Sequence, residues 1–300
     1  MLVVGPNQAF LDYISNVLPS LGEKAVRQCT ALDLCIPKVE VTGSDDAETA
    51  RWKGSAERLA EIEERALAAI QPPDDDVVVP IGARKFTFEA SLVAEWIETA
   101  KDGVVPINQR RERLRVLAQQ ELRRRCNGDD RWRDAGPLKT ALNKCWPTQK
   151  PVRLVDQYLE GPRGAKRMWT PADQFLVDEA NTLLNGTPFT YGHVVVDEAQ
   201  DLSPMQLRVL DRRSLNGSMT IVGDIAHSRV ARSNAHLLKL FGCEVRVVGP
   251  RTLLPPAADS LGVRVFDDLA SALQGADVVM VLRIQRERLE GALLPSLREY

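Results

Sequence analysis

The spacing of apolar residues predicts alternating strands and helices in the last third of the chain. Short runs of β-branched residues there are separated by amphipathic stretches, which is typical of a parallel sheet covered by helices. The expected strands are 219–224, 244–248, 263–266 and 277–282, and the expected helices are 230–241 and 267–273. Right-handed crossovers would join these units into one open sheet with helices on both faces.

The earlier part of the chain begins in the same way and then becomes largely helical. Strands are expected at 2–4, 31–41 and 193–196, with a helix at about 9–18. Between about 44 and 160, the pattern predicts helices and a single hairpin. The expected elements are a helix over 44–71, a hairpin of 77–81 and 84–88, helices over 91–100 and 108–126, and two short helices within 138–159. A further helix is expected over 169–184, with Thr170 as its N-cap.

The composition is that of an ordinary globular chain without a preference for charged partners. Its 300 residues are 44% hydrophobic and 27% charged, and the formal net charge is −2. No apolar run approaches the roughly 20 residues that cross a bilayer, and the N-terminus lacks the pattern of a signal peptide. The five cysteines are scattered and include no C-x-x-C pair, which fits a reducing compartment without a zinc site. We therefore expect a cytoplasmic protein of one large or two ordinary domains that does not bind a membrane.

An acidic pair follows the predicted strand 193–196. The sequence VVVDEAQD places Asp197 and Glu198 at the carboxyl end of this strand, where open parallel sheets bind their ligands. An aspartate there can hold Mg²⁺ through water, and a neighbouring glutamate can orient or deprotonate an attacking water molecule. Both residues are candidate catalytic residues, and Asp197 is the candidate metal ligand if a nucleotide binds. The alternative is that two acidic residues simply end a strand at the surface.

The octapeptide resembles the Walker B motif of UvrD-like superfamily 1 helicases, a branch that includes HelD-like translocases. Residues 1–23 resemble the motif Ia strand and helix of that family. SMTIVGDIA resembles its motif III up to Ala226, where His227 stands in place of the glutamine that senses the γ-phosphate. The resemblance implies Mg-ATP as a cofactor, DNA or RNA polymerase as a partner, and Asn7 and Gln8 as nucleic-acid contacts. A plain strand, turn and helix accounts for Asn7 and Gln8 equally well.

The phosphate-binding sequence that such a motor needs is not present in the chain. The motif G-x-x-x-x-G-K-[ST] holds the phosphates with backbone N–H groups and a lysine, and no match occurs in the 300 residues. In the family, this motif lies upstream of the segment with which the chain begins. We do not expect one continuous sheet, because the first strand of the motor fold would be missing. The arginine-rich run 108–126 fits a phosphate-backbone contact or, alternatively, a solvated helix face.

A second resemblance, carried first by IVGDIAHSRVARSN, covers roughly residues 219–300. With LLKLFGCEVRVVGPRTLLP and VLRIQRERLEGALLPSLREY, this segment resembles the aspartate-binding domain of aspartate carbamoyltransferase. On the family pattern, Arg229 and Arg283 hold the carboxylates of L-aspartate, and Gln285 adds a polar contact. A guanidinium can bind a carboxylate through two parallel charge-assisted hydrogen bonds. The alternative is that Arg229 caps or decorates a helix start and Arg283 is a solvated charge at a strand end.

Residues 228 and 229 open a helix directly after a strand, which is a natural position for an anion. Carbamoyl transfer would also need groups that bind carbamoyl phosphate and stabilise the tetrahedral oxyanion. The family supplies them through the sequences S-T-R-T and H-P-T-Q, and neither sequence occurs in this chain. The resemblance therefore implies L-aspartate and carbamoyl phosphate as ligands, whereas we expect no turnover from this chain alone.

These observations predict an α/β chain of two parts with open parallel sheets and flanking helices. The N-terminal part, residues 1–218, is expected to be a partial helicase-like P-loop domain with a helical insertion at about 44–160. The C-terminal part, residues 219–300, is expected to be a Rossmann-like, partial aspartate-binding domain of a carbamoyltransferase. The predicted function is binding of L-aspartate by a transferase fold that serves pyrimidine biosynthesis. The alternatives are a fragment of a helicase ATPase and a non-functional chimera.

Overall fold

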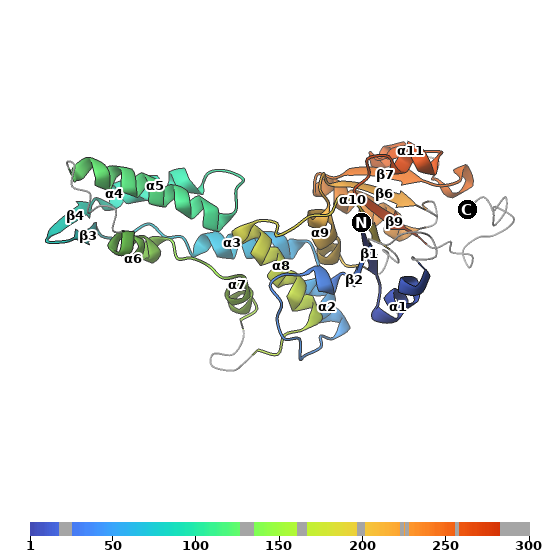
Figure 1. Cartoon of the computed structure of the whole chain (residues 1–300), viewed down its shortest axis with the longest axis horizontal. Coiled ribbons are helices and arrows are strands. Elements are labelled where there is room, and N and C mark those ends of the chain that lie inside the picture. The colour runs from blue at the N-terminus through green and yellow to red at the C-terminus, as the bar shows by residue number, and fades with distance from the viewer. Residues whose placement is uncertain are drawn as a thin grey trace. The chain divides into compact units, whose positions relative to one another are not determined.

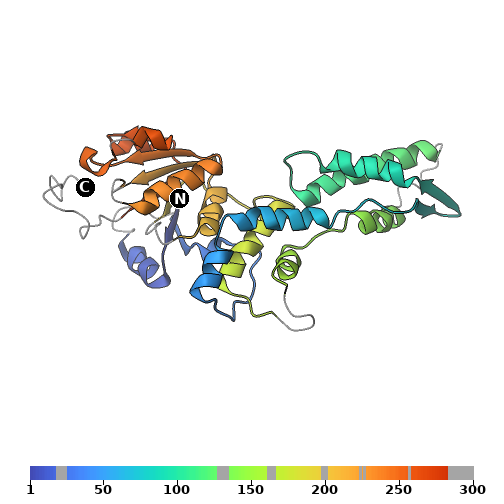
Figure 2. The same ribbon diagram turned by 180° about the vertical axis from the view of Figure 1, so that it is seen from behind.

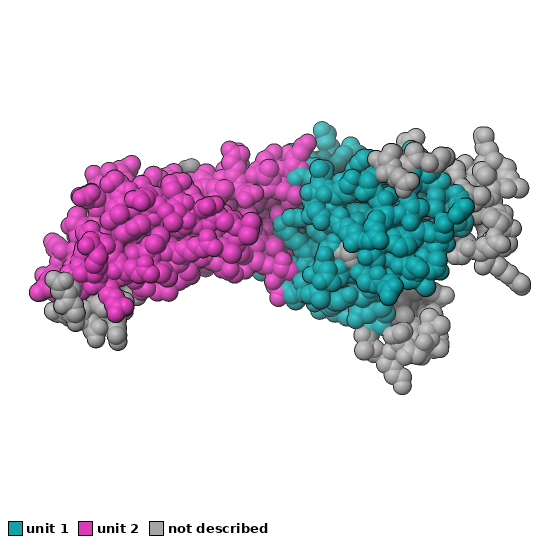
Figure 3. Space-filling model, turned by 90° about the horizontal axis from the view of Figure 1, so that it is seen from above, with its two compact units in different colours: residues 1–56, 169–175, 189–300 teal, residues 57–168, 176–188 magenta. Residues whose placement is uncertain are grey.

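The structure is a computed structural model that describes most of the chain. It describes residues 1–17, 26–126, 135–160, 167–196, 202–222, 225, 228–255 and 258–282. The chain forms two compact units, which are shown in different colours in Figure 3. Unit 1 comprises residues 1–56, 169–175 and 189–300, and unit 2 comprises residues 57–168 and 176–188. None of the helices in the described part combines the length and the apolar character that a membrane crossing requires.

Unit 1 is built on a seven-stranded sheet in which every strand is parallel to its neighbours (Figure 1). The strands follow the order β2-β1-β5-β9-β6-β7-β8. Their bounds are Leu2–Gly5 for β1, Arg27–Thr30 for β2, Val194–Val196 for β5, Ser218–Val222 for β6, Glu244–Val248 for β7, Arg264–Phe266 for β8 and Val278–Val281 for β9. The predicted α/β class with parallel strands and flanking helices is therefore confirmed.

The sheet is continuous across the two parts of the chain, so the expectation that no single sheet would form was wrong. Strand β9 lies between β5 of the N-terminal part and β6, with Val278 opposite both Val194 and Met219. The physical reason lies in the composition of these strands. Val194, Val196 and the first three residues of β9 are buried and apolar, and such a strand can pair with any suitable parallel neighbour.

The C-terminal part contains the predicted alternation of strands and helices. Helix α10 (Arg229–Leu240) connects β6 to β7, and α11 (Leu269–Leu273) connects β8 to β9. Short 3-10 helices, η5 (Arg251–Leu253) and η6 (Ala258–Leu261), lie between β7 and β8. Figure 2 shows α10 lying across the strands of this part. Ala231, Ala235 and Leu238 are the buried apolar residues through which α10 packs.

The N-terminal part of unit 1 corrects one predicted strand. Helix α1 (Gln8–Val17) confirms the expected helix, but the strand expected at 31–41 is absent from this described segment. The strand β2 ends at Thr30, and a 3-10 helix η2 (Leu32–Leu34) follows it. The Asp33 carboxylate accepts hydrogen bonds from the Thr30 amide at 2.9 Å and from its hydroxyl at 2.7 Å. These bonds close a turn, which ends the extended conformation that the apolar residues favoured.

Unit 2 is helical with one hairpin, as the pattern of residues 44–160 predicted. Its helices are α3 (Glu57–Ala68), α4 (Ala90–Lys101), α5 (Ile107–Arg125), α6 (Ala135–Cys145) and α7 (Pro151–Tyr158), together with most of α8 (Pro171–Asn185), which begins in unit 1. The hairpin of β3 (Val77–Ile81) and β4 (Arg84–Phe88) turns at Gly82, whose φ of 59° suits glycine. The expected helix 44–71 is instead two helices, because α2 (Ala47–Lys53) ends at Gly54.

The boundary predicted at residues 218 and 219 divides the chain differently from its two compact units. It falls at the start of β6, inside the sheet of unit 1. The compact units separate the helical region from the sheet instead. The predicted boundary separates two segments that resemble different families, and it stays a prediction.

Candidate ligand-binding edge of the sheet

The carboxyl ends of β5, β9 and β6 are neighbours in the sheet of unit 1. Val196 of β5 lies opposite Met280 of β9, and Val222 of β6 lies opposite Val281. Adjacent strands are roughly 4.8 Å apart. The order of the strands also reverses at β6, because β7 and β8 continue on one side and β9 lies on the other. Ligands bind at such reversals, beyond the carboxyl ends of the strands. We call this place the switch-point edge.

The predicted site residues follow the three strands that end at the switch-point edge. Asp197 and Glu198 come directly after β5, and Arg283 and Gln285 come after β9, but all four lie outside the described residues. Arg229 is the first residue of α10, which follows β6, and only its backbone is described. The structure thus brings together the strands that lead to these residues. The roles of their side chains stay predictions.

The start of α10 is formed by Ser228 in an extended conformation. Its hydroxyl oxygen accepts a hydrogen bond from the Ala231 amide at 3.1 Å, and its side chain is buried. Ser228 is therefore the N-cap, and Arg229 occupies the first helical position. This geometry confirms the predicted helix start after a strand. It also shows that the side-chain cap of the helix comes from Ser228 and not from Arg229.

Asn7 and Gln8 lie at the carboxyl end of β1, where they stabilise the start of α1. The Asn7 side-chain oxygen accepts a hydrogen bond from the Phe10 amide at 2.9 Å, so Asn7 is a helix cap. The Gln8 amide donates to the Asp12 carboxylate at 2.9 Å, one helical turn later. Both contacts favour the account of a plain strand, turn and helix. The proposed contact with nucleic acid stays a prediction.

A buried charge cluster, which we call the Lys53 cluster, lies near the start of α8 within unit 1. The Lys53 ammonium is 2.6 Å from a carboxylate oxygen of Asp45 and 2.7 Å from one of Asp173. Thr170 completes the cluster, because its hydroxyl donates to Asp45 at 2.6 Å and it is the N-cap of α8. Only the cap was predicted from the sequence. Asp45 lies 8 residues before Lys53, whereas Thr170 is 117 residues away from it, and no local pattern signals these contacts.

The arginine-rich helix α5 uses its guanidinium groups inside unit 2. Arg110 donates to the Lys101 carbonyl at the end of α4 and to the Val105 carbonyl in the loop that follows, and Arg113 donates to the Asp102 carbonyl. Arg111 is buried and donates to the Trp146 carbonyl at 2.8 Å. These bonds satisfy carbonyl groups that a helix end or a loop leaves without partners. These three arginines of the basic run therefore stabilise the packing of unit 2.

The carboxylate of Glu121 on α5 is expected to make the stability of unit 2 sensitive to acid. Hydrogen bonds from Arg124 and then Arg125 lower its pKa from 4.5 to about 2. A lowered pKa in the folded state contributes stability above pH 4.5, and this contribution is lost as the pH falls toward 2. In Glu121→Gln, the free energy of unfolding should therefore depend less on pH between 4.5 and about 2. Acid unfolding followed by circular dichroism measures this difference. Identical acid curves for the two proteins would contradict the assignment.

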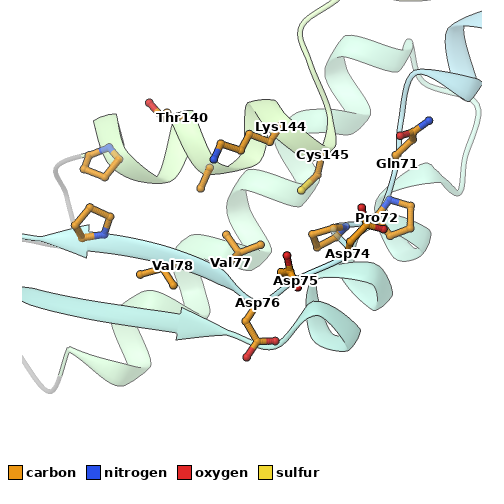
Figure 4. A pocket seen from close by; sticks show the side chains of 14 residues that line it. Gln71, Pro72, Asp74, Asp75, Asp76, Val77, Val78, Thr140, Lys144 and Cys145 are labelled. Atoms are coloured by element: carbon orange, nitrogen blue, oxygen red, sulfur yellow. The ribbon is translucent and has the colours of Figure 1, made fainter.

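A cavity of about 820 Å³ lies in unit 2, where the hairpin faces α6 (Figure 4). Its lining includes Asp74, Asp75, Asp76 and Lys144. The Asp76 carboxylate accepts a hydrogen bond from the Ala90 amide at 3.0 Å, so this residue stabilises the start of α4. The residues predicted for ligand binding do not line this cavity. Within the described ranges, no group of three or more His, Cys, Asp or Glu residues is arranged to hold a metal ion.

The five cysteines are buried, and Cys29 and Cys243 in particular are poorly suited to nucleophilic chemistry. Burial raises the pKa of the Cys29 thiol to about 11, and it also raises the pKa of Cys243. The nucleophilic form of cysteine is the thiolate, so these shifts disfavour it at neutral pH.

Comparison with known proteins identifies one segment of the chain. No family model matches. A segment of 82 residues, 27% of the chain, is 66% identical to the aspartate carbamoyltransferase catalytic subunit of Sorangium cellulosum. The catalytic subunits of Granulibacter bethesdensis and Rhodospirillum rubrum are 59% identical over 83 residues and 57% identical over 82 residues, respectively. In each case, the chain spans 26% of the length of the relative.

These comparisons give no support to the helicase resemblance of residues 1–226, which stays a prediction. The chain therefore contains a segment similar to aspartate carbamoyltransferase catalytic subunits.

Proposed function

We propose that the C-terminal part of the chain binds L-aspartate at the switch-point edge. Arg229 and Arg283 would bind the two carboxylates, and Gln285 would add a polar contact. The observation that carries the proposal is the pairing of β6 with β9, which ends with Val222 opposite Val281. This pairing makes neighbours of the two strands that precede Arg229 and Arg283. The segment of 82 residues that is 66% identical to an aspartate carbamoyltransferase catalytic subunit supports the proposal.

The chemistry of the site suits a small dianion. L-aspartate carries two carboxylates, and two guanidinium groups can each form paired hydrogen bonds with one of them. The start of α10 adds the partial positive charge of a helix N-terminus, which favours an anion at the same place. The name of the relatives implies aspartate as the acceptor of a carbamoyl group. In that reaction, the aspartate amine attacks the carbonyl carbon of carbamoyl phosphate, and phosphate leaves.

The proposal for this chain is limited to aspartate binding. Carbamoyl transfer needs donors that stabilise the oxyanion of the tetrahedral intermediate. The carbamoyltransferase sequences S-T-R-T and H-P-T-Q, which serve carbamoyl phosphate, do not occur in the 300 residues. Arg229, Arg283 and Gln285 would serve recognition of the amino acid, and carbamoyl phosphate would require further groups.

The test is a calorimetric titration of the full chain with L-aspartate, D-aspartate and L-glutamate. We expect saturable binding of one L-aspartate per chain. A single extra methylene changes binding by about tenfold or more, so L-glutamate should bind more weakly by at least that factor. D-aspartate should also bind more weakly, because the opposite configuration at its α-carbon cannot place both carboxylates and the amine where the L-enantiomer places them. Absence of binding, or equal binding of all three amino acids, would overturn the proposal.

The helicase alternative makes a different prediction about Asp197 and Glu198. A motor ATPase holds its nucleotide through the motif G-x-x-x-x-G-K-[ST], and no match occurs in the 300 residues. We therefore expect the chain to release no phosphate from Mg-ATP above background, with or without single-stranded DNA. Phosphate release that is lost in Glu198→Gln would contradict this expectation and would favour the helicase hypothesis instead.

A further inference from the structure

We infer that Ser228 is a positioning residue that also keeps the aspartate site free of negative charge. The inference rests on the proposed function of the switch-point edge. Ser228 is the N-cap of α10, its side chain is only 3% exposed, and the next residue is Arg229. A cap at this position determines where the helix begins, and therefore where the first helical residue is placed.

The hydrogen bond of Ser228 controls the first turn of α10. Its hydroxyl oxygen accepts from the Ala231 amide at 3.1 Å, which satisfies one of the amides that a helix start leaves without an internal acceptor. The amides of the first two helical residues are not satisfied by such a bond and are directed beyond the helix end. They can donate to a carboxylate oxygen beside Arg229. Loss of the cap would let this turn fray and would displace both the amides and Arg229.

The rest of α10 is held in place without the cap. Ala231, Ala235 and Leu238 are at most 1% exposed, so the body of the helix packs through its buried face. At its other end, the Phe241 amide bonds to the Leu237 carbonyl at 3.1 Å, and the chain then turns at Gly242 with a φ of 81°. A change at Ser228 should therefore affect the first turn much more than the fold.

The cap of α10 is a neutral serine, although other helices of the same chain have an aspartate cap. Asp268 caps α11 and Asp46 caps α2, with bonds of 2.7 Å from Ser271 and Thr49, respectively. Aspartate and serine are about equally effective caps, and a negative charge at a helix N-terminus is usually favourable. An aspartate beside Arg229 would nevertheless repel a dianionic ligand and pair with the arginine. A neutral cap is thus what an anion-binding helix start requires.

The experiment compares three variants of the full chain by melting temperature and by calorimetric affinity for L-aspartate. Ser228→Ala should lower the melting temperature by about 2–4 °C and weaken affinity by about fivefold. Ser228→Asp should weaken affinity by about tenfold or more, and thus by more than Ser228→Ala, because it adds a negative charge beside the ligand. The matched control is Ser203→Ala, which removes the serine cap of α9 (Pro204–Arg213). It should lower the melting temperature by a similar amount and leave the affinity unchanged.

Two results would overturn the inference, and they differ from a failure of the proposed function. If Ser228→Asp binds L-aspartate as tightly as wild type, Ser228 has no influence on the charge of the site. If Ser203→Ala and Ser228→Ala weaken binding equally, the effect comes from general destabilisation and not from positioning. If the wild-type chain does not bind L-aspartate, the proposed function fails first and the inference fails with it.

Discussion

Replacement of Arg283 by alanine is expected to weaken L-aspartate binding by roughly 100-fold, which corresponds to about 3 kcal/mol. The loss is large because a ligand carboxylate would be left desolvated without its charged partner. Arg283→Lys should recover only part of the affinity, because an ammonium keeps the charge but cannot form the paired hydrogen bonds of a guanidinium. Calorimetric titration of the two variants measures both effects.

The matched control for Arg283 is an arginine at the opposite edge of the sheet. Arg264 is the first residue of β8, and its guanidinium lies 2.9 Å from the Glu244 carboxylate at the start of β7. Arg264→Ala removes the same kind of side chain from unit 1, so it should change the affinity for L-aspartate less than about twofold. Equal losses in the Arg283 and Arg264 variants would show that net charge, and not the switch-point edge, determines binding.

Replacement of Lys53 by methionine should destabilise unit 1 by about 3–5 kcal/mol. Lys53 is the cation shared by the two carboxylates of its cluster, and the side chains of Asp45 and Asp173 are only 9% and 1% exposed. Without the lysine, the carboxylates of Asp45 and Asp173 would remain close together in the protein interior without a cation to balance them. Urea unfolding of wild type and Lys53→Met measures the change in the free energy of unfolding.

Two further variants separate this explanation from a general loss of packing. Arg251→Met breaks the exposed ion pair with Asp267 and should change the free energy of unfolding by less than about 0.5 kcal/mol. Adding Asp45→Asn and Asp173→Asn to Lys53→Met removes the uncompensated charges and should restore much of the lost stability. The account of the Lys53 cluster is wrong if Lys53→Met costs no more than Arg251→Met.

Local patterns in the sequence predict most elements of this fold. β7 has the predicted bounds because the alternation of Glu244–Val248 and its flanking residues suits a strand. The hairpin in unit 2 is likewise predicted by the turn at Gly82 and Ala83 between two β-prone runs. The failures come from competing local bonds. Asp33 closes a turn where apolar residues favoured a strand, and Gly54 divides a long helical pattern in two.

Contacts between distant segments could not be predicted from the same patterns. The pairing of Val194 with Val278 makes the sheet continuous, but nothing in either strand specifies its neighbour. The contacts of Lys53 with Thr170 and Asp173, which are distant in the chain, could not be predicted for the same reason. At the candidate site, the sequence predicted the helix start at residues 228 and 229. The neighbouring ends of β6 and β9 are a property of the fold, because they depend on the order of the strands.

A crystal structure of the chain grown with saturating L-aspartate would show directly whether the ligand binds at the switch-point edge. We expect one ligand molecule beyond the carboxyl ends of β6 and β9, with its carboxylates within hydrogen-bonding distance of Arg229 and Arg283. We also expect a first-turn amide of α10 to donate to one of these carboxylates. L-aspartate bound instead in the cavity of unit 2, or elsewhere away from the switch-point edge, would show that the switch-point edge is not the aspartate site.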